Sequence, residues 1–241
     1  MATLVYVVGS EGEWSNDSEL LYSLRSLSKY AKNVDRVVII TNQKLNWLNH
    51  DKVEVIPFEE KHKLGYRNVW DKIDYACNII STPFVLMNDD FLLNKKMDMN
   101  ELPLYLGKNP LKSLSNCKDK RYAKLILNTI ESLEHLGIVP YNYALHAPMV
   151  IEPYYWRVIM RVFNKDTPIS IRSAYGSVFH RGNGVLTDDY KINKIINRGT
   201  EIEDIAKVAA WISLSDAFMV STHGKVFLQV NYSKKSKYEL C

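Results

Sequence analysis

The stretch from residue 83 to residue 93 most constrains the fold, because it places three polar residues between two short apolar runs. Residues 84–87 (FVLM) are expected to form a buried strand, which Asn88, Asp89 and Asp90 follow directly. Two adjacent carboxylates at the end of a buried strand are costly unless a partner neutralises them. Mg²⁺ or Mn²⁺, which bind oxygen ligands, would be such a partner. The alternative is an ordinary turn, where Asn and Asp are also favoured.

Other apolar segments alternate between strand-like and helical patterns. Apolar, β-rich runs cover residues 4–8, 36–41 and 52–57, and residues 67–80 have apolar side chains at helical spacing. Strands that alternate with helices are typical of βαβ units and a mostly parallel sheet. We therefore predict an α/β fold, a Rossmann-like and mostly parallel sheet flanked by helices, in a single domain of residues 1–241.

Polar residues follow several of these strands. In open α/β sheets, ligands bind beyond the carboxyl ends of the strands. The residues at these ends are therefore predicted to share one ligand pocket with the acidic motif, and they are Gly9, Ser10, Thr41 and Asn42. Lys72 is expected near the open end of the helix at 67–80, and it is a further candidate, with an ordinary exposed helix lysine as the alternative.

Composition limits the class of protein. With 241 residues, 46% of them hydrophobic, the chain can bury a full core, and its three cysteines lack the spacing of a disulfide framework or a zinc site. The sequence begins without a basic signal region, and no apolar run reaches the length of a membrane span. We expect a cytoplasmic protein without membrane contact. Its net charge of +4 permits an anionic partner.

Several blocks of the first half resemble the Stealth-type sugar transferases, which act on nucleotide sugars and are related in fold to GT-A glycosyltransferases. The matching blocks are ELLYSLRSLSKYAKNVDRVVIITNQ at 19–43, WL at 47–48, VEVIPF at 53–58 and MNDDFLL at 87–93. The resemblance spans roughly residues 4–93. It implies a nucleotide-sugar-binding half at 1–93 and an acceptor half at 94–241.

The same resemblance implies roles for individual residues. Arg25 and Asn42 would face the donor, while Asn88, Asp89 and Asp90 would hold the metal and the diphosphate. One departure concerns the first strand, which in the family ends in a TWVDGSD-like block and here reads VYVVGSEGEW. The missing aspartate counts against sugar-1-phosphate transfer, so ordinary glycosyl transfer is favoured.

Two residues of the second half complete the candidate site. His146 lies in an apolar tract and resembles a His-Pro-containing block of the family, so it is predicted as a metal ligand or catalytic group, with a hydrogen-bonded core histidine as the alternative. Arg172 lies in a strand-like run and is a candidate for phosphate binding, with a surface arginine as the alternative. The elements predicted in this half are helices at 118–136, 154–163, 187–196 and 201–219 and strands at 169–180 and 225–230.

The sequence thus predicts a metal-dependent glycosyltransferase using a nucleotide sugar and Mn²⁺ or Mg²⁺. Two alternatives stay open: transfer of sugar-1-phosphate to a polysaccharide, and a non-catalytic nucleotide or nucleic-acid binding module on the same fold. Lysine is concentrated near the C-terminus, in Lys225, Lys234, Lys235 and Lys237, and this basic tail suggests an anionic acceptor. The acceptor predicted is a hydroxymethylated pyrimidine in DNA, as modified by bacteriophage glycosyltransferases. Lys234 and Lys235 would then contact phosphates. The alternative is a glycan acceptor with a solvated tail.

Overall fold

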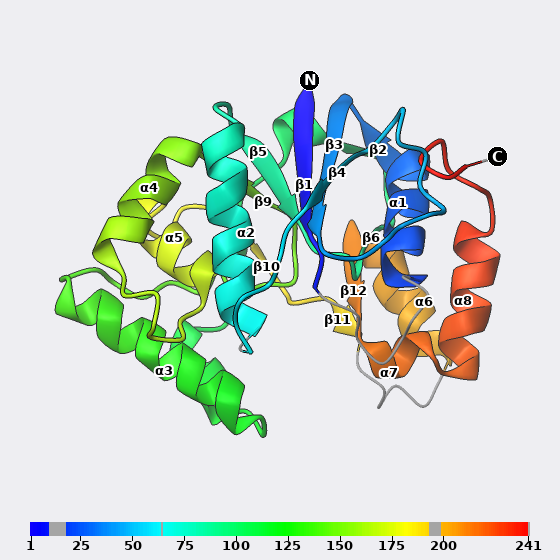
Figure 1. Ribbon diagram of the computed structural model, residues 1–241. Coiled ribbons are helices and arrows are strands. Elements are labelled where there is room, and N and C mark those ends of the chain that lie inside the picture. Colours follow the sequence, from blue (N-terminus) through cyan, green and yellow to red (C-terminus); the bar gives the residue numbers. More distant parts are fainter. Residues whose placement is uncertain (10–17, 64, 193–198, 241) are drawn as a thin grey trace.

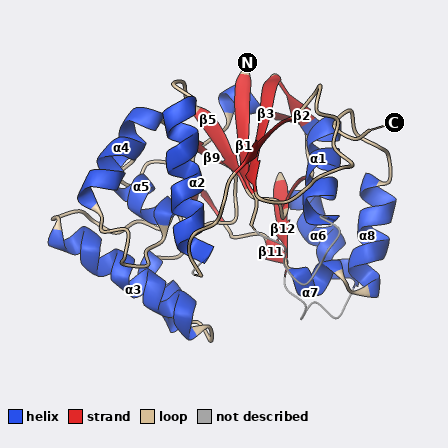
Figure 2. Ribbon diagram, viewed as in Figure 1, coloured by secondary structure: helices blue, strands red, loops and turns tan. Residues whose placement is uncertain are grey.

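A five-stranded sheet forms the centre of the molecule (Figures 1 and 2). The computed structural model describes residues 1–9, 18–63, 65–192 and 199–240. The strand order is β4-β3-β1-β5-β9, in which β9 is antiparallel to β5 and the other pairs are parallel. The strands are β1 (Ala2–Val7), β3 (Val34–Thr41), β4 (Glu54–Pro57), β5 (Phe84–Met87) and β9 (Met149–Ile151). The predicted α/β fold with a mostly parallel sheet is confirmed.

Alternating side chains of β1 explain why both faces of this sheet are covered. Leu4 and Tyr6 point to one face and pack with the leucines of helix α1 (Ser18–Tyr30). Val5 and Val7 point to the other face and pack against apolar side chains of three more helices. These helices are α2 (Gly65–Ile79), α4 (Pro153–Val162) and α5 (Ile171–Phe179). A strand buried on both faces has no polar positions, which is why residues 4–8 are uniformly apolar.

The acidic motif connects the central sheet to a second, smaller sheet. The chain leaves β5, passes through residues 88–90 and enters β6 (Phe91–Leu93). There it pairs antiparallel with β12 (Trp211–Leu214), which also pairs with β11 (Lys191–Ile192). Three helices build a separate apolar cluster with this sheet, and they are α6 (Gly199–Val208), α7 (Asp216–Met219) and α8 (Thr222–Tyr232).

Shorter elements complete the described chain. Two parallel strand pairs join β8 (Tyr105–Gly107) to β10 (Val185–Thr187) and β2 (Ala31–Lys32) to β7 (Met97–Asp98). The 3-10 helices are η1 (Met99–Glu101) and η2 (Leu111–Asn116), and the long helix α3 (Lys120–His135) packs against η2 and α5. Among the described residues, no helix is both long and apolar enough to cross a membrane.

Several predictions for the second half are wrong. The run at 169–180 forms helix α5 and the run at 225–230 lies within helix α8, although both were predicted as strands. Each helix has a serine N-cap: the Ser170 side chain accepts from Ser173 N, and the Ser221 side chain accepts from Gly224 N. These caps satisfy free backbone N–H groups and outweigh the β-branched and aromatic content.

The predicted helices at 187–196 and 201–219 are also wrong in part. The first region contains the end of β10, three residues without regular structure and β11, while its residues 193–196 lie outside the described residues. The second is interrupted by β12, whose four residues are all buried between β6 and β11. Pairing in a sheet decides the structure of such a short apolar run, which periodicity alone does not identify.

Candidate functional site

A pocket of about 410 Å³ opens at the carboxyl ends of β1 and β5. Five residues of the predicted site line it, and they are Gly9, Asn88, Asp89, His146 and Arg172. Its remaining wall is mostly apolar and comes from α2, α3 and the start of α5, with Tyr66 and Tyr122 among its aromatic side chains. The structure therefore brings residues from both halves of the sequence together where parallel sheets bind their ligands.

Arg172 lies beside the acidic motif rather than on the surface. Its guanidinium donates to the Ala147 carbonyl at 2.5 Å and to Asn88 Oδ1 at 3.1 Å, and it lies over the Phe91 ring. Burial lowers the pKa of Arg172 to about 10, an effect that the charges of Asp90 and Asp189 partly oppose. At neutral pH the side chain is still a cation, and both of these hydrogen bonds go to uncharged oxygens.

Asp90 points toward the small sheet. Its Oδ2 accepts a hydrogen bond of 2.5 Å from Ser213 Oγ on β12, and its backbone carbonyl accepts from Leu214 N. The other carboxylate oxygen, Oδ1, is buried and has no hydrogen-bond partner in the described part of the chain. A carboxylate oxygen in this position is costly to bury, so the site has an unsatisfied demand for a donor or a cation.

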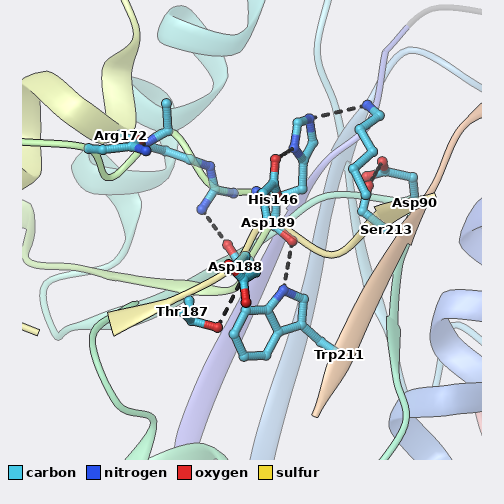
Figure 3. Close-up of polar contacts among 12 residues, drawn as sticks. Asp90, His146, Arg172, Thr187, Asp188, Asp189, Trp211 and Ser213 are labelled. Carbon is cyan, nitrogen blue, oxygen red and sulfur yellow. Dashed lines mark hydrogen bonds and ion pairs between the residues drawn. The ribbon is translucent and has the colours of Figure 1, made fainter. Parts of the chain in front are cut away.

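His146 is held at both ring nitrogens (Figure 3). Asp189 accepts from the His146 backbone N–H at 2.9 Å and from the ring Nδ1 at 2.8 Å. On the other side of the ring, Lys191 Nζ lies 3.1 Å from Nε2. The carbonyl of His146 accepts from the indole of Trp211 at 2.8 Å. Four hydrogen bonds to three residues thus fix the position of this histidine at the edge of the pocket.

Asp189 is ionised in this arrangement. Burial by itself would raise its pKa, but hydrogen bonds from the His146 side chain and backbone, together with the charge of Lys191, hold the pKa of Asp189 below its usual range. An ionised carboxylate is only an acceptor, so the Nδ1 of His146 carries a proton and donates. In the neutral ring Nε2 is then the unprotonated nitrogen, and the Lys191 ammonium is its donor.

The predicted metal set of Asp89, Asp90 and His146 is not assembled as such. Among the described residues, no three His, Cys, Asp or Glu side chains are grouped closely enough to hold a metal ion. The physical reason is that His146 directs its ring nitrogens to Asp189 and Lys191 instead. Any metal would therefore rest on the acidic motif without His146.

Other predicted residues have structural roles. Lys72 is almost fully buried, donates to the Val8 carbonyl at 2.5 Å and pairs with Glu60, so its prediction as an open donor-binding lysine is wrong. Thr41 is buried and its hydroxyl accepts from Gln43 N, while Asn42 is exposed beside it, and neither lines the pocket. Ser10 lies outside the described residues.

Arg25 is not at the pocket, and this prediction is wrong as well. Its guanidinium makes two hydrogen bonds to the Glu239 carboxylate, at 3.0 and 2.8 Å, and a third to the Tyr232 carbonyl at the end of α8. The reason is that α8 packs beside α1 on the face of the sheet opposite α2. Lys234 and Lys235 follow α8 and line a surface hollow together with Arg25 and Lys29 of α1. Figure 1 shows α8 on the side of the molecule away from α3 and α5.

We expect Arg25→Ala to lower the free energy of unfolding by about 2–3 kcal/mol, because it leaves a buried carboxylate without its partner. Burial by itself would raise the pKa of Glu239, but its bonds with Arg25 and Ser236 hold that pKa below the usual range. The loss should therefore be complete at neutral pH and shrink as the pH falls below the carboxyl range. Denaturant unfolding at several pH values measures it. The control is Arg36→Ala, which breaks an exposed pair with Glu54 and should cost less than about 0.5 kcal/mol.

Two residues at the centre of the site, Asp189 and Lys191, were not predicted from the sequence. The signal for Asp189 was present, because Asp188-Asp189 follows a short apolar run just as Asp89-Asp90 does. The region was assigned to a helix, which hid the resemblance between the two acidic pairs. Lys191 gave no comparable signal, since single lysines are ordinarily solvated.

Neither a protein-family model nor a curated protein matches this sequence. The class that fold and site define is thus an α/β protein with a polar pocket at the carboxyl edge of a mostly parallel sheet.

Proposed function

We propose that this protein is a glycosyltransferase that binds a nucleotide sugar in the pocket at the carboxyl ends of β1 and β5. The observation that carries the proposal is that one pocket gathers Asn88, Asp89, His146 and Arg172. A nucleotide sugar needs cations for its diphosphate and an apolar wall for its base. Arg172 and the mostly apolar wall of this pocket supply the first of these cations and the wall.

Arg172 supports the choice of an anionic ligand. Arg172 is a partly buried cation with Asp90 and Asp189 as nearby charges, but its two hydrogen bonds go to a carbonyl and an amide oxygen. A phosphate group entering the pocket would give the guanidinium an anion to bind directly, and a guanidinium binds two phosphate oxygens at once.

The acidic motif supports a bound Mg²⁺ or Mn²⁺. Asp90 Oδ1, which has no hydrogen-bond partner among the residues that the structure describes, fits a hard cation, and Asp89 lines the adjoining pocket. Asp89 and Asp90 would hold the metal, which would offset negative charge on the departing diphosphate. Asp89 and Arg172 line the pocket, while Asp90 lies near Arg172, and Asp189 and Lys191 contact the lining residue His146. Three carboxylates therefore stand against two cations among these five residues. This balance favours an added cation when a diphosphate enters.

The chain's own groups account for the rest of the reaction. In a direct displacement the acceptor oxygen bonds to the anomeric carbon, and the bond from that carbon to the diphosphate oxygen breaks with its electrons left on the diphosphate. The acceptor proton must pass to a base. His146 Nε2 is the unprotonated ring nitrogen and Asp189 orients the ring, so His146 is the base that we assign.

The proposal is tested by incubating the protein with UDP-, GDP- and CMP-sugars, each with and without Mn²⁺, and measuring slow hydrolysis of the donor. Hydrolysis of one donor class that depends on Asp90 supports an enzyme. If no donor is hydrolysed while nucleotides bind equally well to wild type and Asp90→Asn, the protein is the binding module that we gave as an alternative.

The acceptor stays a prediction, namely hydroxymethylated pyrimidine in DNA, with a glycan as the alternative. Lys234 and Lys235 lie on the side of α8, so DNA would have to reach around the molecule to contact both these lysines and the pocket. Transfer of a labelled sugar to hydroxymethylcytosine DNA, to unmodified DNA and to oligosaccharides compares the acceptors. Label on oligosaccharides alone would exclude DNA and retain glycosyl transfer.

We expect Arg172→Met to weaken binding of a nucleoside diphosphate by about 10- to 100-fold, because it removes the partly buried cation but keeps much of the side-chain volume. Calorimetric titration measures the change. A suitable control is Arg157→Met, since Arg157 also donates to a carbonyl, that of Cys77, but lies on α4 outside the pocket. Equal affinity of Arg172→Met and wild type would contradict the role of Arg172.

A further inference from the structure

Lys191 occupies the one nitrogen of His146 that could receive a proton. Asp189 fixes the proton on Nδ1, at 2.8 Å, and the Lys191 ammonium lies 3.1 Å from Nε2. A lone pair that accepts a hydrogen bond from an ammonium is not open to a hydroxyl group at the same time. The ring of His146 is therefore oriented for proton transfer, but its Nε2 is occupied by the hydrogen bond from Lys191.

The partner of Lys191 is a weak one for an ammonium. A neutral imidazole offers no charge, whereas a phosphate oxygen offers a charge-assisted hydrogen bond of roughly twice the strength of a neutral one. An ammonium has three N–H donors, and the contact with His146 uses one of them. His146 lines the pocket beside Asn88 and Arg172, so an anion bound by Arg172 lies within the same pocket as the ring next to Lys191.

We propose that Lys191 is a diphosphate-binding residue that releases His146 when the donor enters. Resting on the proposed function, this assigns an order to the reaction: the diphosphate draws the ammonium away from Nε2, and only then does the ring accept the proton of an acceptor hydroxyl. His146 keeps its proton on Nδ1 throughout because Asp189 accepts from both its backbone N–H and its Nδ1. Asp189 is a positioning residue, which acts through the ring.

Such an arrangement has a chemical purpose. A base that is open before the donor binds would take a proton from water or an acceptor when no sugar is present. A base that opens only with the donor makes acceptor activation depend on the bound diphosphate. The device needs two cations with separate tasks: Arg172 anchors the anion on one side, and Lys191 responds to it on the other.

The test uses inorganic pyrophosphate with Mg²⁺, which is diamagnetic, so it needs neither a known sugar nor any transfer. In protein with ¹⁵N-labelled histidine, the ring nitrogens of His146 are assigned by comparison with His146→Gln, since the chain has six histidines. We expect a proton on Nδ1 and a hydrogen-bonded Nε2 in the free protein. Pyrophosphate should shift the Nε2 signal toward that of a free nitrogen.

Lys191→Met should show the shifted Nε2 signal without any ligand and should bind pyrophosphate about tenfold more weakly. The matched control is Lys108→Met, whose ammonium pairs with Asp188, next to Asp189, and which should respond as wild type does. An Nε2 signal in Lys191→Met identical to that of wild type, or one that pyrophosphate leaves unchanged in wild type, overturns the inference. Because these readings do not involve sugar transfer, an inactive protein with the expected spectra would refute the glycosyltransferase and leave the role of Lys191 intact.

Discussion

Asp90→Asn should reduce sugar transfer by about 100- to 1,000-fold while the protein remains folded. The substitution keeps the shape of the side chain, and the amide oxygen can still accept from Ser213 Oγ, which lies 2.5 Å from Asp90 Oδ2. The substitution removes the negative charge of the Asp90 carboxylate. Its Oδ1 is buried and has no hydrogen-bond partner among the described residues. The variant should therefore lose Mn²⁺ affinity and turnover together, because the metal and the diphosphate charge depend on this carboxylate.

Two measurements check this expectation. Calorimetric titration with Mn²⁺ gives the metal affinity, and hydrolysis of the donor identified in the nucleotide-sugar panel gives turnover. A matched control is Asp35→Asn, because Asp35 is exposed at the opposite, amino end of β3 and should leave both quantities unchanged. Wild-type Mn²⁺ affinity and turnover in Asp90→Asn would contradict the proposal that Asp90 binds a metal ion.

Asp189→Asn is expected to lower kcat by about 100-fold or more with a much smaller effect on donor affinity. An asparagine amide can donate to Nδ1, which would move the ring proton to Nε2 and leave no unprotonated nitrogen facing Lys191. The ring would stay in place but carry its proton on the wrong atom. Steady-state kinetics separates the effects on kcat and KM, and the ¹⁵N spectrum of the His146 ring reports the tautomer directly.

The control for this variant is the neighbouring Asp188→Asn, which removes an exposed ion pair with Lys108. It should retain kcat and the His146 tautomer. A purely structural role of Asp189 would instead lower stability without exchanging the two nitrogen signals, so the spectrum distinguishes the two explanations. Unchanged kcat in Asp189→Asn would exclude His146 as the base.

The first half of the fold could be predicted from the sequence because its signals are local and repeated. The predicted strand at 84–87 matches β5, and the strands around it are apolar on both faces because both faces are covered. From this pattern follows the edge where Gly9, Asn88 and Asp89 meet. The second half was harder, since β12 is a strand only because β6 lies beside it, and this pairing spans more than 100 residues.

For the site itself, residue type was a better guide than expected position. Arg172 reached the pocket although its segment was predicted as a strand, because Ser170 begins a helix that directs it toward Asn88. Arg25 lies in a block that resembles the family, yet in the structure it forms a salt bridge with Glu239. Tertiary packing determines which carboxylate pairs with an arginine, so the sequence around Arg25 does not predict its partner.

The pairing of Arg25 with Glu239 also affects the rate at which the protein unfolds. These residues are 214 positions apart, so forming their contact has the entropic cost of closing a very long loop. The contact therefore adds little net stability until most of the chain has folded. A contact of this kind belongs to the late stage of folding, after the transition state. Its stabilisation should therefore appear almost wholly as slower unfolding. In Arg25→Ala the folding rate would stay near that of wild type, and the C-terminal segment would detach from α1 at a higher rate.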